Sequence, residues 1–474
     1  MYLYKLVVFL FIIVNYSWAS LIGANYNQRD MQILEDLQIK SSFITDYKLQ
    51  KTYNNLLREH NQTNYVKKLS DASLFVPKIK KILREESVPS VFLYMAMAES
   101  DFTIDAKSNV KATGIWQFMS ETGKHFDLDI NLYVDERMDL VKSTKAATKY
   151  LKYLHKRFDK WYLAALAYNC GEGRVIEAIT RATIDKYIQE NPSKKNSNKI
   201  KEFRRIIYYY QRGSEPFYKL NNIYKEVKNW NIPLDIDDFL RVQKNVSRQY
   251  IPSESRMYIR KIIALGMMNN QSFITENDNA HLLNIGATSS VATISVKGGL
   301  HLRSISNAVG IDYEEIKNLN KHLKLQIVPP YEKKYDIYIP YSRLARYQAN
   351  KDLIKDSKYL VYVVKRGDSL HKIGNKYNVS YKVIKDFNRL KTNLLSLKQK
   401  LIIPISSEKR ASRKNIRLAD SSNKSSSTLV YKVKNGDTLY SIARKYKVDL
   451  KKLMSDNGLE SNFINIGDKI VIKK

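Results

Sequence analysis

Glu99 stands at the end of an unusually apolar run, in surroundings that favour a protonated carboxyl group. Residues 91–98 (VFLYMAMA) are apolar on nearly every side of a helix, which indicates a buried helix. Ser87 is placed to cap this helix and Pro89 to fit its first turn. A carboxylate at its end loses water and faces the negative end of the helix dipole, and both effects raise its pKa. Such an acid can protonate a glycosidic oxygen. The alternative is a solvated glutamate that closes a helix.

Four motifs follow Glu99 in order along the chain. They are residues 112–119 (ATGIWQFM), 134–137 (VDER), 167–175 (AYNCGEGRV) and 251–258 (IPSESRMY). Hydroxyl and amide side chains suited to hold Glu99 or a sugar are Ser100, Gln117, Tyr168 and Asn169. Glu254 and Tyr258 lie one helical turn apart and are expected to support the site, with simple packing as the alternative.

Other conspicuous residues have structural interpretations. Trp116 and Phe118 are expected in the core rather than as a sugar platform. Cys170 is expected to be a small buried residue, since no histidine motif accompanies it. The seven histidines show no metal-ligand spacing, so neither a metal nor a cofactor is expected.

The elements that must position these residues are mainly helices. The pattern predicts a helical N-terminal region at 20–75 and a helical catalytic domain at 76–270, interrupted by a polar loop at 191–198. A linker is expected at 271–293 and a second one at 406–429, which is rich in Ser, Lys and Arg.

The C-terminal third repeats itself. Residues 362–370 (YVVKRGDSL) recur as residues 431–439 (YKVKNGDTL), and the similarity extends over 361–405 and 430–474. Each copy predicts a strand, a Gly-Asp turn, two helices and a closing strand. A diverged third copy is expected at 294–340, where Lys-Gly-Gly replaces the Gly-Asp turn.

Composition limits the classes of partner. The 474 residues carry a net charge of +33, from 80 basic and 47 acidic side chains. This charge favours nucleic acid, an anionic membrane or a carboxylate-bearing polymer. No nucleic-acid motif accompanies it, so nucleic acid is not expected as a partner.

The N-terminus has the form of an export signal. Lys5 precedes a short apolar core, and small residues up to Ala19 suit a signal peptidase, which predicts a signal peptide at 1–19. An uncleaved anchor is the alternative. The single cysteine, Cys170, excludes an intramolecular disulfide and leaves no cysteine for a lipid anchor near the cleavage site. No transmembrane segment is expected in the mature chain.

The two close repeats resemble LysM modules, βααβ domains that bind N-acetylglucosamine-containing glycans. The four motifs after Glu99, in their order, resemble the lysozyme-like catalytic domain of the family 1 lytic transglycosylases, with Cys170 in place of the family's alanine. The resemblance implies a mainly α lysozyme-like domain followed by small α+β LysM modules. It also implies an exported protein in the periplasm of a Gram-negative bacterium that acts on peptidoglycan.

The resemblance also assigns roles. Glu99 would be the sole acid/base, cleaving between N-acetylmuramic acid and N-acetylglucosamine to leave a 1,6-anhydro end, whereas ordinary glycosidases use two carboxyl groups. Substrate binding would fall to Ser100, Gln117, Tyr168, Asn169, Glu254 and Tyr258. Glycan binding in the LysM modules would fall to Gly367, Asp368, Ser369, Asn388, Gly436, Asp437, Thr438 and Asn457. A hydrolytic muramidase and a catalytically inert peptidoglycan-binding scaffold are the alternatives.

Overall fold

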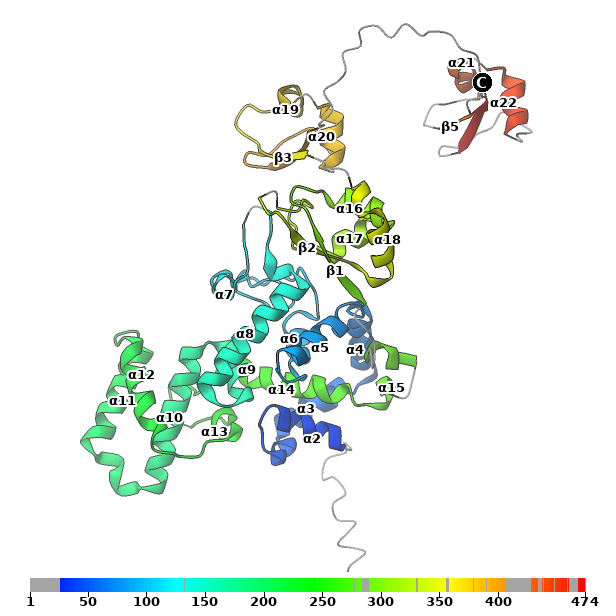
Figure 1. Ribbon diagram of the computed structural model, residues 1–474. Helices are drawn as coiled ribbons and strands as arrows, with labels where there is room; N and C mark the ends of the chain where they lie inside the picture. The colour runs from blue at the N-terminus through cyan, green and yellow to red at the C-terminus, as the bar shows by residue number, and fades with distance from the viewer. Residues whose placement is uncertain are drawn as a thin grey trace, which may run out of the picture. The chain divides into compact units, whose positions relative to one another are not determined.

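The computed structural model describes residues 26–473 with short gaps (Figure 1). The residues left out are 1–25, 132, 245, 276–277, 284–289, 330, 355–357, 378, 389, 406–427, 434–436, 438, 447, 458, 460–467 and 474. The chain divides into two compact units, residues 1–407 and 408–474. The predicted signal peptide and most of the predicted linker at 406–429 lie outside the described residues.

The first unit begins with a body in which every regular element of the described residues is a helix. The α-helices are α2 (Gln28–Asp36), α3 (Tyr47–Leu56), α4 (Glu59–Asp71), α5 (Val76–Glu85), α6 (Phe92–Ser100), α7 (Ser120–His125), α8 (Leu140–Phe158), α9 (Trp161–Cys170), α10 (Glu172–Glu190), α11 (Asn198–Gln211), α12 (Phe217–Lys228), α13 (Ile236–Leu240), α14 (Ser253–Met268) and α15 (Ser272–Thr275). Short 3-10 helices are η1 (Ser41–Thr45), η2 (Glu136–Met138), η3 (Pro192–Asn196) and η4 (Asp278–Leu283).

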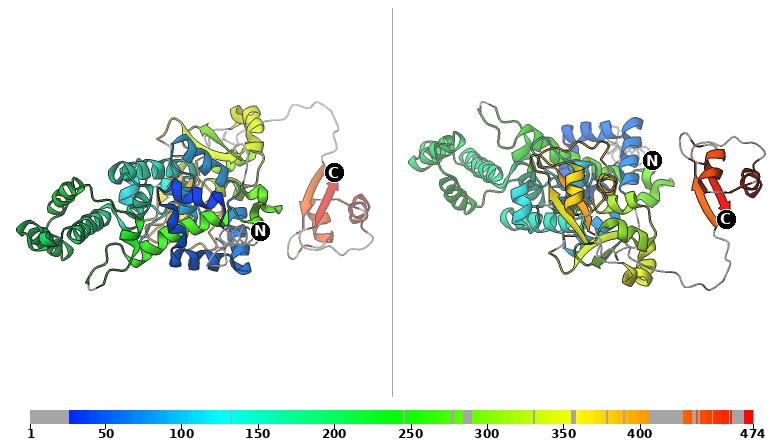
Figure 2. Two further views of the ribbon diagram at one scale, coloured as in Figure 1. Left: turned by 90° about the horizontal axis from the view of Figure 1, so that it is seen from below. Right: turned by 90° about the horizontal axis from the view of Figure 1, so that it is seen from above.

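The N-terminal helices share one hydrophobic core with the helices of the catalytic motifs. Buried residues from Ile33 to Leu282 form a single cluster. The Tyr65 hydroxyl of α4 donates to the carbonyl of Leu265 in α14 at 3.0 Å. The buried Arg260 of α14 makes two bonds, of 2.7 and 2.8 Å, to the carboxylate of Asp46, which caps α3. The region predicted at 20–75 is therefore packed against α14 rather than standing apart, as the blue helices in Figure 2 show.

Helix α6 is buried as predicted, but its start differs from the prediction. Residues Phe92–Met97 are all buried, and no side chain caps the helix. Ser87 has a φ of 55°, and its N–H donates to the carbonyl of Arg84, so it terminates α5 instead of capping α6. Pro89 lies in the turn before α6, where its carbonyl accepts from the N–H of Phe92. A residue in the left-handed conformation ends a helix rather than starting one, which is why the prediction for Ser87 was wrong.

The predicted polar loop at 191–198 contains η3 and leads into a hairpin of α11 and α12 (Figure 1). The Ser197 hydroxyl accepts from the N–H of Ile200 and caps α11. The fully buried Glu177 of α10 accepts from Gln211 at 2.6 Å and pairs with Arg174 at 2.8 Å. This buried carboxylate ties the hairpin to α10.

Three small modules follow, each with two antiparallel strands and two helices. They consist of β1 (Val291–Val296), α16 (Leu302–Val309), α17 (Tyr313–Leu319) and β2 (Tyr335–Pro340); of β3 (Lys358–Val363), α19 (Leu370–Tyr377), α20 (Tyr381–Phe387) and β4 (Lys400–Ile405); and of β5 (Thr428–Lys432), α21 (Leu439–Tyr446), α22 (Leu450–Asp456) and β6 (Lys469–Lys473). The first module is followed by η5 (Tyr341–Arg343), α18 (Leu344–Asn350) and η6 (Lys351–Leu353). The expectation of a mainly α protein with βααβ modules is confirmed.

One asparagine in each module joins the second helix to the closing strand. The Asn388 amide donates to the carbonyls of Ile384 and Ile402, and its oxygen accepts from the N–H of Ile402. Asn320 and Asn457 make the equivalent three bonds in their own modules. This shared bonding pattern supports the assignment of the diverged copy as a third module.

The first module packs on the helical body through buried tyrosines. The Tyr335 hydroxyl donates to Glu136 at 2.8 Å, and the Tyr338 hydroxyl donates to Asp139 at 2.5 Å. Asp139 also caps α8 by accepting from two backbone N–H groups. Val134 of the helical body is part of the module's own hydrophobic core.

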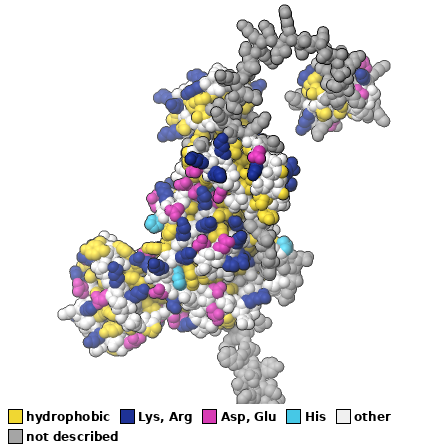
Figure 3. All heavy atoms as spheres, viewed as in Figure 1, with side chains coloured by type: hydrophobic (Ala, Val, Ile, Leu, Met, Phe, Trp, Pro, Cys, Tyr) yellow, Lys and Arg dark blue, Asp and Glu magenta, His cyan; other side chains and the backbone are white. Residues whose placement is uncertain are grey.

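Lys and Arg side chains are spread over the face seen in Figure 3 rather than gathered in one stripe. Among the described residues, no helix has both the length and the apolar character needed to cross a bilayer.

Candidate active site

A cleft of about 690 Å³ brings together six of the seven residues predicted for catalysis and substrate binding. Glu99, Gln117, Tyr168, Asn169, Glu254 and Tyr258 all line it, together with Thr52, Ala98, Ser108, Val110, Ala112, Met119, Met257 and Lys261. The wall is built from α3, α6, the end of α9, α14 and the loop between α6 and α7. Ser100 is not part of the wall.

Glu99 and Tyr258 are joined across this cleft. The Tyr258 hydroxyl donates to Oε1 of Glu99 at 2.5 Å. Burial raises the pKa of the Glu99 carboxyl, and this outweighs the lowering by the Tyr258 hydrogen bond. Burial and the neighbouring Glu99 raise the pKa of Tyr258 well above its usual range, so the phenol keeps its proton and acts as the donor.

Two charged neighbours act on Glu99 in opposite directions. The ammonium group of Lys261 donates to the carbonyl of Ala98 at 3.1 Å and lowers the pKa of Glu99. The carboxyl group of Glu254 lines the same cleft and raises it. With burial as the largest effect, the net direction for Glu99 is upward, which suits a general acid.

Tyr168 is held by the backbone of the loop between α6 and α7. Its hydroxyl donates to the carbonyl of Trp116 at 2.8 Å, and its ring lies 6.0 Å from that of Phe118. Burial and the nearby Glu99 raise its pKa, so this phenol also stays neutral. Trp116 and Phe118 are buried, which confirms their prediction as core residues.

Asn169 is oriented by a residue to which the sequence assigned no role. The buried Ser255 hydroxyl donates to Oδ1 of Asn169 at 2.6 Å. This bond fixes the side-chain oxygen on the side of α14 and leaves the amide NH₂ available to the cleft. The signal for Ser255 was its place inside the motif at 251–258, between Glu254 and Tyr258.

Gln117 and Ser100 hold the loop between α6 and α7. Gln117 has a φ of 46°, and its amide donates to the carbonyl of Gly114 at 2.8 Å. Its side-chain oxygen remains as an acceptor in the cleft. The Ser100 hydroxyl donates to the carbonyl of Ile115 at 2.9 Å. Ser100 is therefore placed to position the loop rather than to touch a substrate, and its predicted sugar contact stays a prediction.

Arg137 clamps the same loop, a role that the sequence did not reveal. Its guanidinium pairs with Asp135 at 2.8 and 2.9 Å and donates to the carbonyls of Lys111 and Phe118 at 3.1 Å each. Gly114 packs so closely that an added Cβ would lie 1.8 Å from the Arg137 carbonyl oxygen, and its φ of +87° also favours glycine. The motif at 134–137 thus holds in place the loop that lines one side of the cleft.

Cys170 is partly buried beside the cleft, and burial raises the pKa of its thiol to about 11. A thiol with this pKa is almost entirely protonated at neutral pH and is a poor nucleophile. This agrees with its prediction as a packing residue.

Three family models match parts of the chain. Residues 77–191 match the transglycosylase SLT domain, and residues 362–404 and 431–473 each match the LysM domain. Residues 290–356 match a domain described as "Lytic transglycosylase MltD, LysM-like domain". The SLT match, together with the cleft around Glu99, supports lytic transglycosylase activity. The LysM-like match covers the diverged copy that the sequence predicted at 294–340.

Relatives of this lytic transglycosylase include the membrane-bound lytic murein transglycosylase D of Escherichia coli (strain K12). It is 26% identical over 407 residues, which cover 82% of this chain and 74% of that protein. A putative tributyltin chloride resistance protein of Alteromonas sp. (strain M-1) is 41% identical over 99 residues, 21% of this chain and 48% of that protein. The crystal structure of the Bacillus cereus spore cortex-lytic enzyme SleL is 23% identical over 24% of this chain and 22% of that chain, with a TM-score of 0.10.

Some of the residues predicted to bind glycan in the LysM modules form hydrogen bonds with other residues of their own module. Asp368 accepts from the Tyr362 hydroxyl and from the N–H of Lys365, and Asp437 accepts from the Tyr431 hydroxyl. Ser369 caps α19 by accepting from the N–H of Lys372. Their predicted partners Gly436 and Thr438 lie outside the described residues.

The other residues predicted to bind glycan in the LysM modules are Gly367, Asn388 and Asn457. Gly367 has a φ of +84°, nothing lies within 4 Å of where its Cβ would be, and its carbonyl accepts from the Lys372 ammonium at 2.9 Å. The amides of Asn388 and Asn457 are occupied by the helix-to-strand bonds described above. The role of these three residues in glycan binding stays a prediction.

Proposed function

We propose that this lytic transglycosylase cleaves the β-1,4 bond between N-acetylmuramic acid and N-acetylglucosamine in peptidoglycan and leaves a 1,6-anhydro end. The observation that carries the proposal is the Glu99 carboxyl group, whose pKa is raised by burial in a cleft lined with amide and hydroxyl side chains. A single carboxyl group that is first an acid and then a base is sufficient for this reaction.

The reaction needs one proton donor and no water. Glu99 gives its proton to the glycosidic oxygen as the bond from that oxygen to C1 of the muramoyl sugar breaks. The Glu99 carboxylate then takes the proton of the C6 hydroxyl, and O6 bonds to C1 to close the anhydro ring. The Tyr258 hydroxyl stabilises the carboxylate between the two steps, because its hydrogen bond favours the charged form.

The amide groups of the cleft suit an N-acetylated sugar. The Asn169 NH₂ can donate to an acetamido or hydroxyl oxygen, and the Gln117 oxygen can accept an acetamido N–H. Tyr168 keeps its phenol against the Trp116 carbonyl, so its ring edge borders the sugar. These contacts would orient the muramoyl sugar with its C1 next to Glu99.

Glu254 is the one feature of the cleft that favours a second candidate, the hydrolytic muramidase. A second carboxylate could activate water, which would give a reducing end instead of an anhydro end. The negative charge of Glu254 raises the pKa of Glu99, so Glu254 can assist the reaction without transferring a proton itself. We therefore assign Glu254 to tuning Glu99 and keep hydrolysis as the alternative outcome.

The LysM modules at 361–405 and 430–474 would hold the glycan while the catalytic domain cuts it, because tethering raises the effective substrate concentration. Export through the segment at 1–19 would deliver the enzyme to the periplasm. The net charge of +33 would favour a wall rich in peptide carboxylates.

Mass spectrometry of digested peptidoglycan tests the reaction. Anhydro muropeptides, lighter by one water than reducing ones, are the expected product, and predominantly reducing muropeptides would contradict the proposal. A Glu99→Gln variant should lose cleavage by a factor of at least about 100. It should still sediment with insoluble peptidoglycan, while a chain lacking residues 361–474 should sediment less. Cleavage that survives in Glu99→Gln would refute the role of Glu99.

A further inference from the structure

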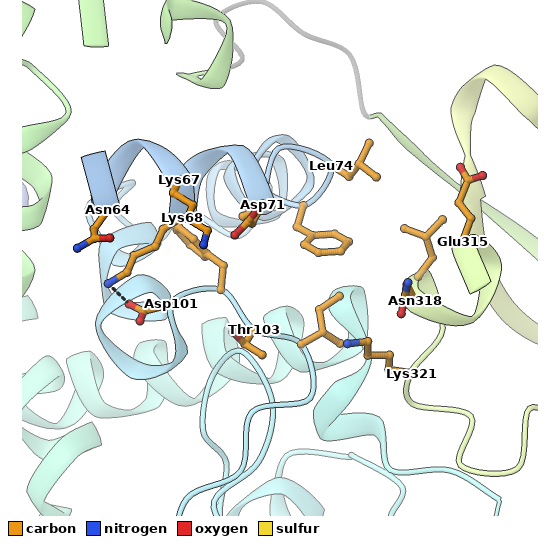
Figure 4. A pocket seen from close by; sticks show the side chains of 15 residues that line it. Asn64, Lys67, Lys68, Asp71, Leu74, Asp101, Thr103, Glu315, Asn318 and Lys321 are labelled. Carbon is orange, nitrogen blue, oxygen red and sulfur yellow. Dashed lines mark ion pairs between the residues drawn. The ribbon is translucent and has the colours of Figure 1, made fainter. Parts of the chain in front are cut away.

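A second cleft, of about 640 Å³, lies where the helical body meets the first module (Figure 4). Three segments far apart in the sequence form it: α4, the stretch 101–104 that follows α6, and α17 of the module. The module is held there by the tyrosine bonds to Glu136 and Asp139, so the wall on its side is fixed to the body.

Its charged side chains are of both signs, and some of them have no ionic partner. Lys68 pairs with Asp101 at 2.7 Å, and Lys321 pairs with Asp105 at 2.9 Å. Three exposed charges of the cleft, by contrast, form no ion pair with any other residue that the structure describes: Lys67, Asp71 and Glu315. Lys67 and Asp71 stand one turn apart on α4, and Glu315 is on α17 on the opposite side of the cleft (Figure 4).

Between these charges the cleft is apolar. Phe75 and Leu319 are part of one small hydrophobic cluster, and Ile104 is buried beside them. The lining contains no tyrosine or tryptophan; of its two phenylalanines, Phe102 is buried and Phe75 is partly buried against the hydrophobic cores. An apolar floor with cations and anions at its edge suits a short peptide that carries both carboxylates and an amine.

The end of α6 separates this cleft from the catalytic one. Ala98 and Glu99 line the catalytic cleft, whereas Asp101 to Ile104 line the second. Asp101 has a φ of 50° and ends the helix, and its carboxylate pairs with Lys68 of α4. The peptide stem is attached to the muramoyl sugar itself, so a stem that reaches the second cleft from the catalytic one would pass the end of α6.

We propose that the second cleft binds the peptide stem of the peptidoglycan strand whose glycan lies in the catalytic cleft. This inference rests on the proposed function. Lys67 would bind a stem carboxylate, Asp71 or Glu315 the stem amine, and the apolar floor the small side chains between them. The first module would then act as a wall of this cleft, a different task from that of the two C-terminal LysM modules.

A double variant, Lys67→Ala with Asp71→Ala, tests the proposal without changing the net charge. Its cleavage rate is compared on intact glycan strands and on strands from which an amidase has removed the stems. We expect kcat/KM to fall about tenfold on stem-bearing strands, as for the loss of a charged contact, and less than about twofold on stripped strands. An equal fall on both substrates, or no fall on either, would overturn the proposal.

The matched control is Lys201→Ala with Glu202→Ala, which removes an exposed pair of opposite charges from α11. It should leave both rates unchanged.

A direct measurement uses a fluorescent stem tetrapeptide and the full-length Glu99→Gln protein. The anisotropy should rise on binding, and adding the Lys67 and Asp71 substitutions should weaken binding at least about fivefold. If the wild-type enzyme cuts no peptidoglycan, the proposed function fails. The binding assay alone then tests whether the second cleft binds the stem peptide. Unchanged binding would overturn the proposal.

Discussion

The hydroxyl of Tyr258 donates a 2.5 Å hydrogen bond to Glu99, although the two residues are 159 positions apart. Tyr258 is on α14 and Glu99 on α6, two helices that pack together in the same core. The contact pairs a buried acid with a donor that favours its charged form. The reaction proposed for Glu99 needs the acid first protonated and then ionised, and this arrangement supports both states.

Replacing Tyr258 by Phe should move the pH–rate profile to higher pH. The hydrogen bond lowers the pKa of Glu99, so its loss raises that pKa, and the active protonated acid persists further into the alkaline range. We also expect the rate to fall about tenfold, because the carboxylate formed after the first step loses a partner. The pH dependence of kcat/KM measures both effects.

The matched control for that variant is Tyr65→Phe, which removes a buried hydroxyl that bonds to α14 at Leu265. It should lower stability without displacing the pH–rate profile. An alkaline limb that stays in place or moves to lower pH in Tyr258→Phe would show that the hydrogen bond does not control Glu99.

Replacing Glu254 by Gln should move the profile in the opposite direction. The negative charge of Glu254 raises the pKa of Glu99, so its removal lowers that pKa and the rate begins to fall at lower pH. The anhydro product should persist, and the rate at the new optimum should stay within about tenfold of wild type. Loss of activity as complete as in Glu99→Gln would instead make Glu254 a second catalytic carboxyl group and favour hydrolysis.

Gly114→Ala should damage the cleft out of proportion to the size of a methyl group. The new Cβ would lie 1.8 Å from the Arg137 carbonyl, so the loop that carries Gln117 must move. We expect a loss of about 2–4 kcal/mol in the free energy of unfolding and at least about tenfold in activity. Gly213→Ala is the control, because Gly213 also has a positive φ (75°) but open space around it. The free energy of unfolding is measured with urea, and the activity by cleavage rate. Equal losses in Gly114→Ala and Gly213→Ala would contradict the close contact at Gly114.

Tyr338→Phe should loosen the first module from the helical body. It leaves the buried Asp139 without its 2.5 Å partner while that carboxylate still caps α8. The free energy of unfolding should fall by about 1–3 kcal/mol. Tyr341→Phe, at an exposed position, should have no effect on the urea midpoint. Equal midpoints for Tyr338→Phe and wild type would mean that the buried bond contributes nothing to docking.

Local pattern was enough to predict the buried helix that ends at Glu99 and the repeated modules, while the roles of the cleft residues came from the resemblance of four motifs to a known family. Glu254 and Tyr258 were recognisable because their spacing puts them on one helix face. The contacts that hold the site together were not predictable, since they join distant segments: Arg260 with Asp46, Ser255 with Asn169, and Arg137 with Lys111 and Phe118.

The error at Ser87 has the same origin. A serine before an apolar run is the usual signal for a helix cap, but here the preceding helix ends at that residue. Only the φ of 55° distinguishes the two roles, and residue type alone does not reveal it. The structural bonds of Asn388 and Asn457 within their modules were not predictable from residue type either, because each joins a helix to a strand 14 residues further along the chain.

Titration of Glu99 tests the central claim most directly. The carboxyl carbon of Glu99 is followed by carbon-13 NMR across the pH range, with Glu99→Gln identifying its signal in the labelled protein. A raised pKa predicts that this carboxyl titrates clearly above the ordinary glutamate value of about 4.3. A carboxyl that titrates at or below that value, with and without bound glycan, would contradict its role as the acid that cleaves the strand.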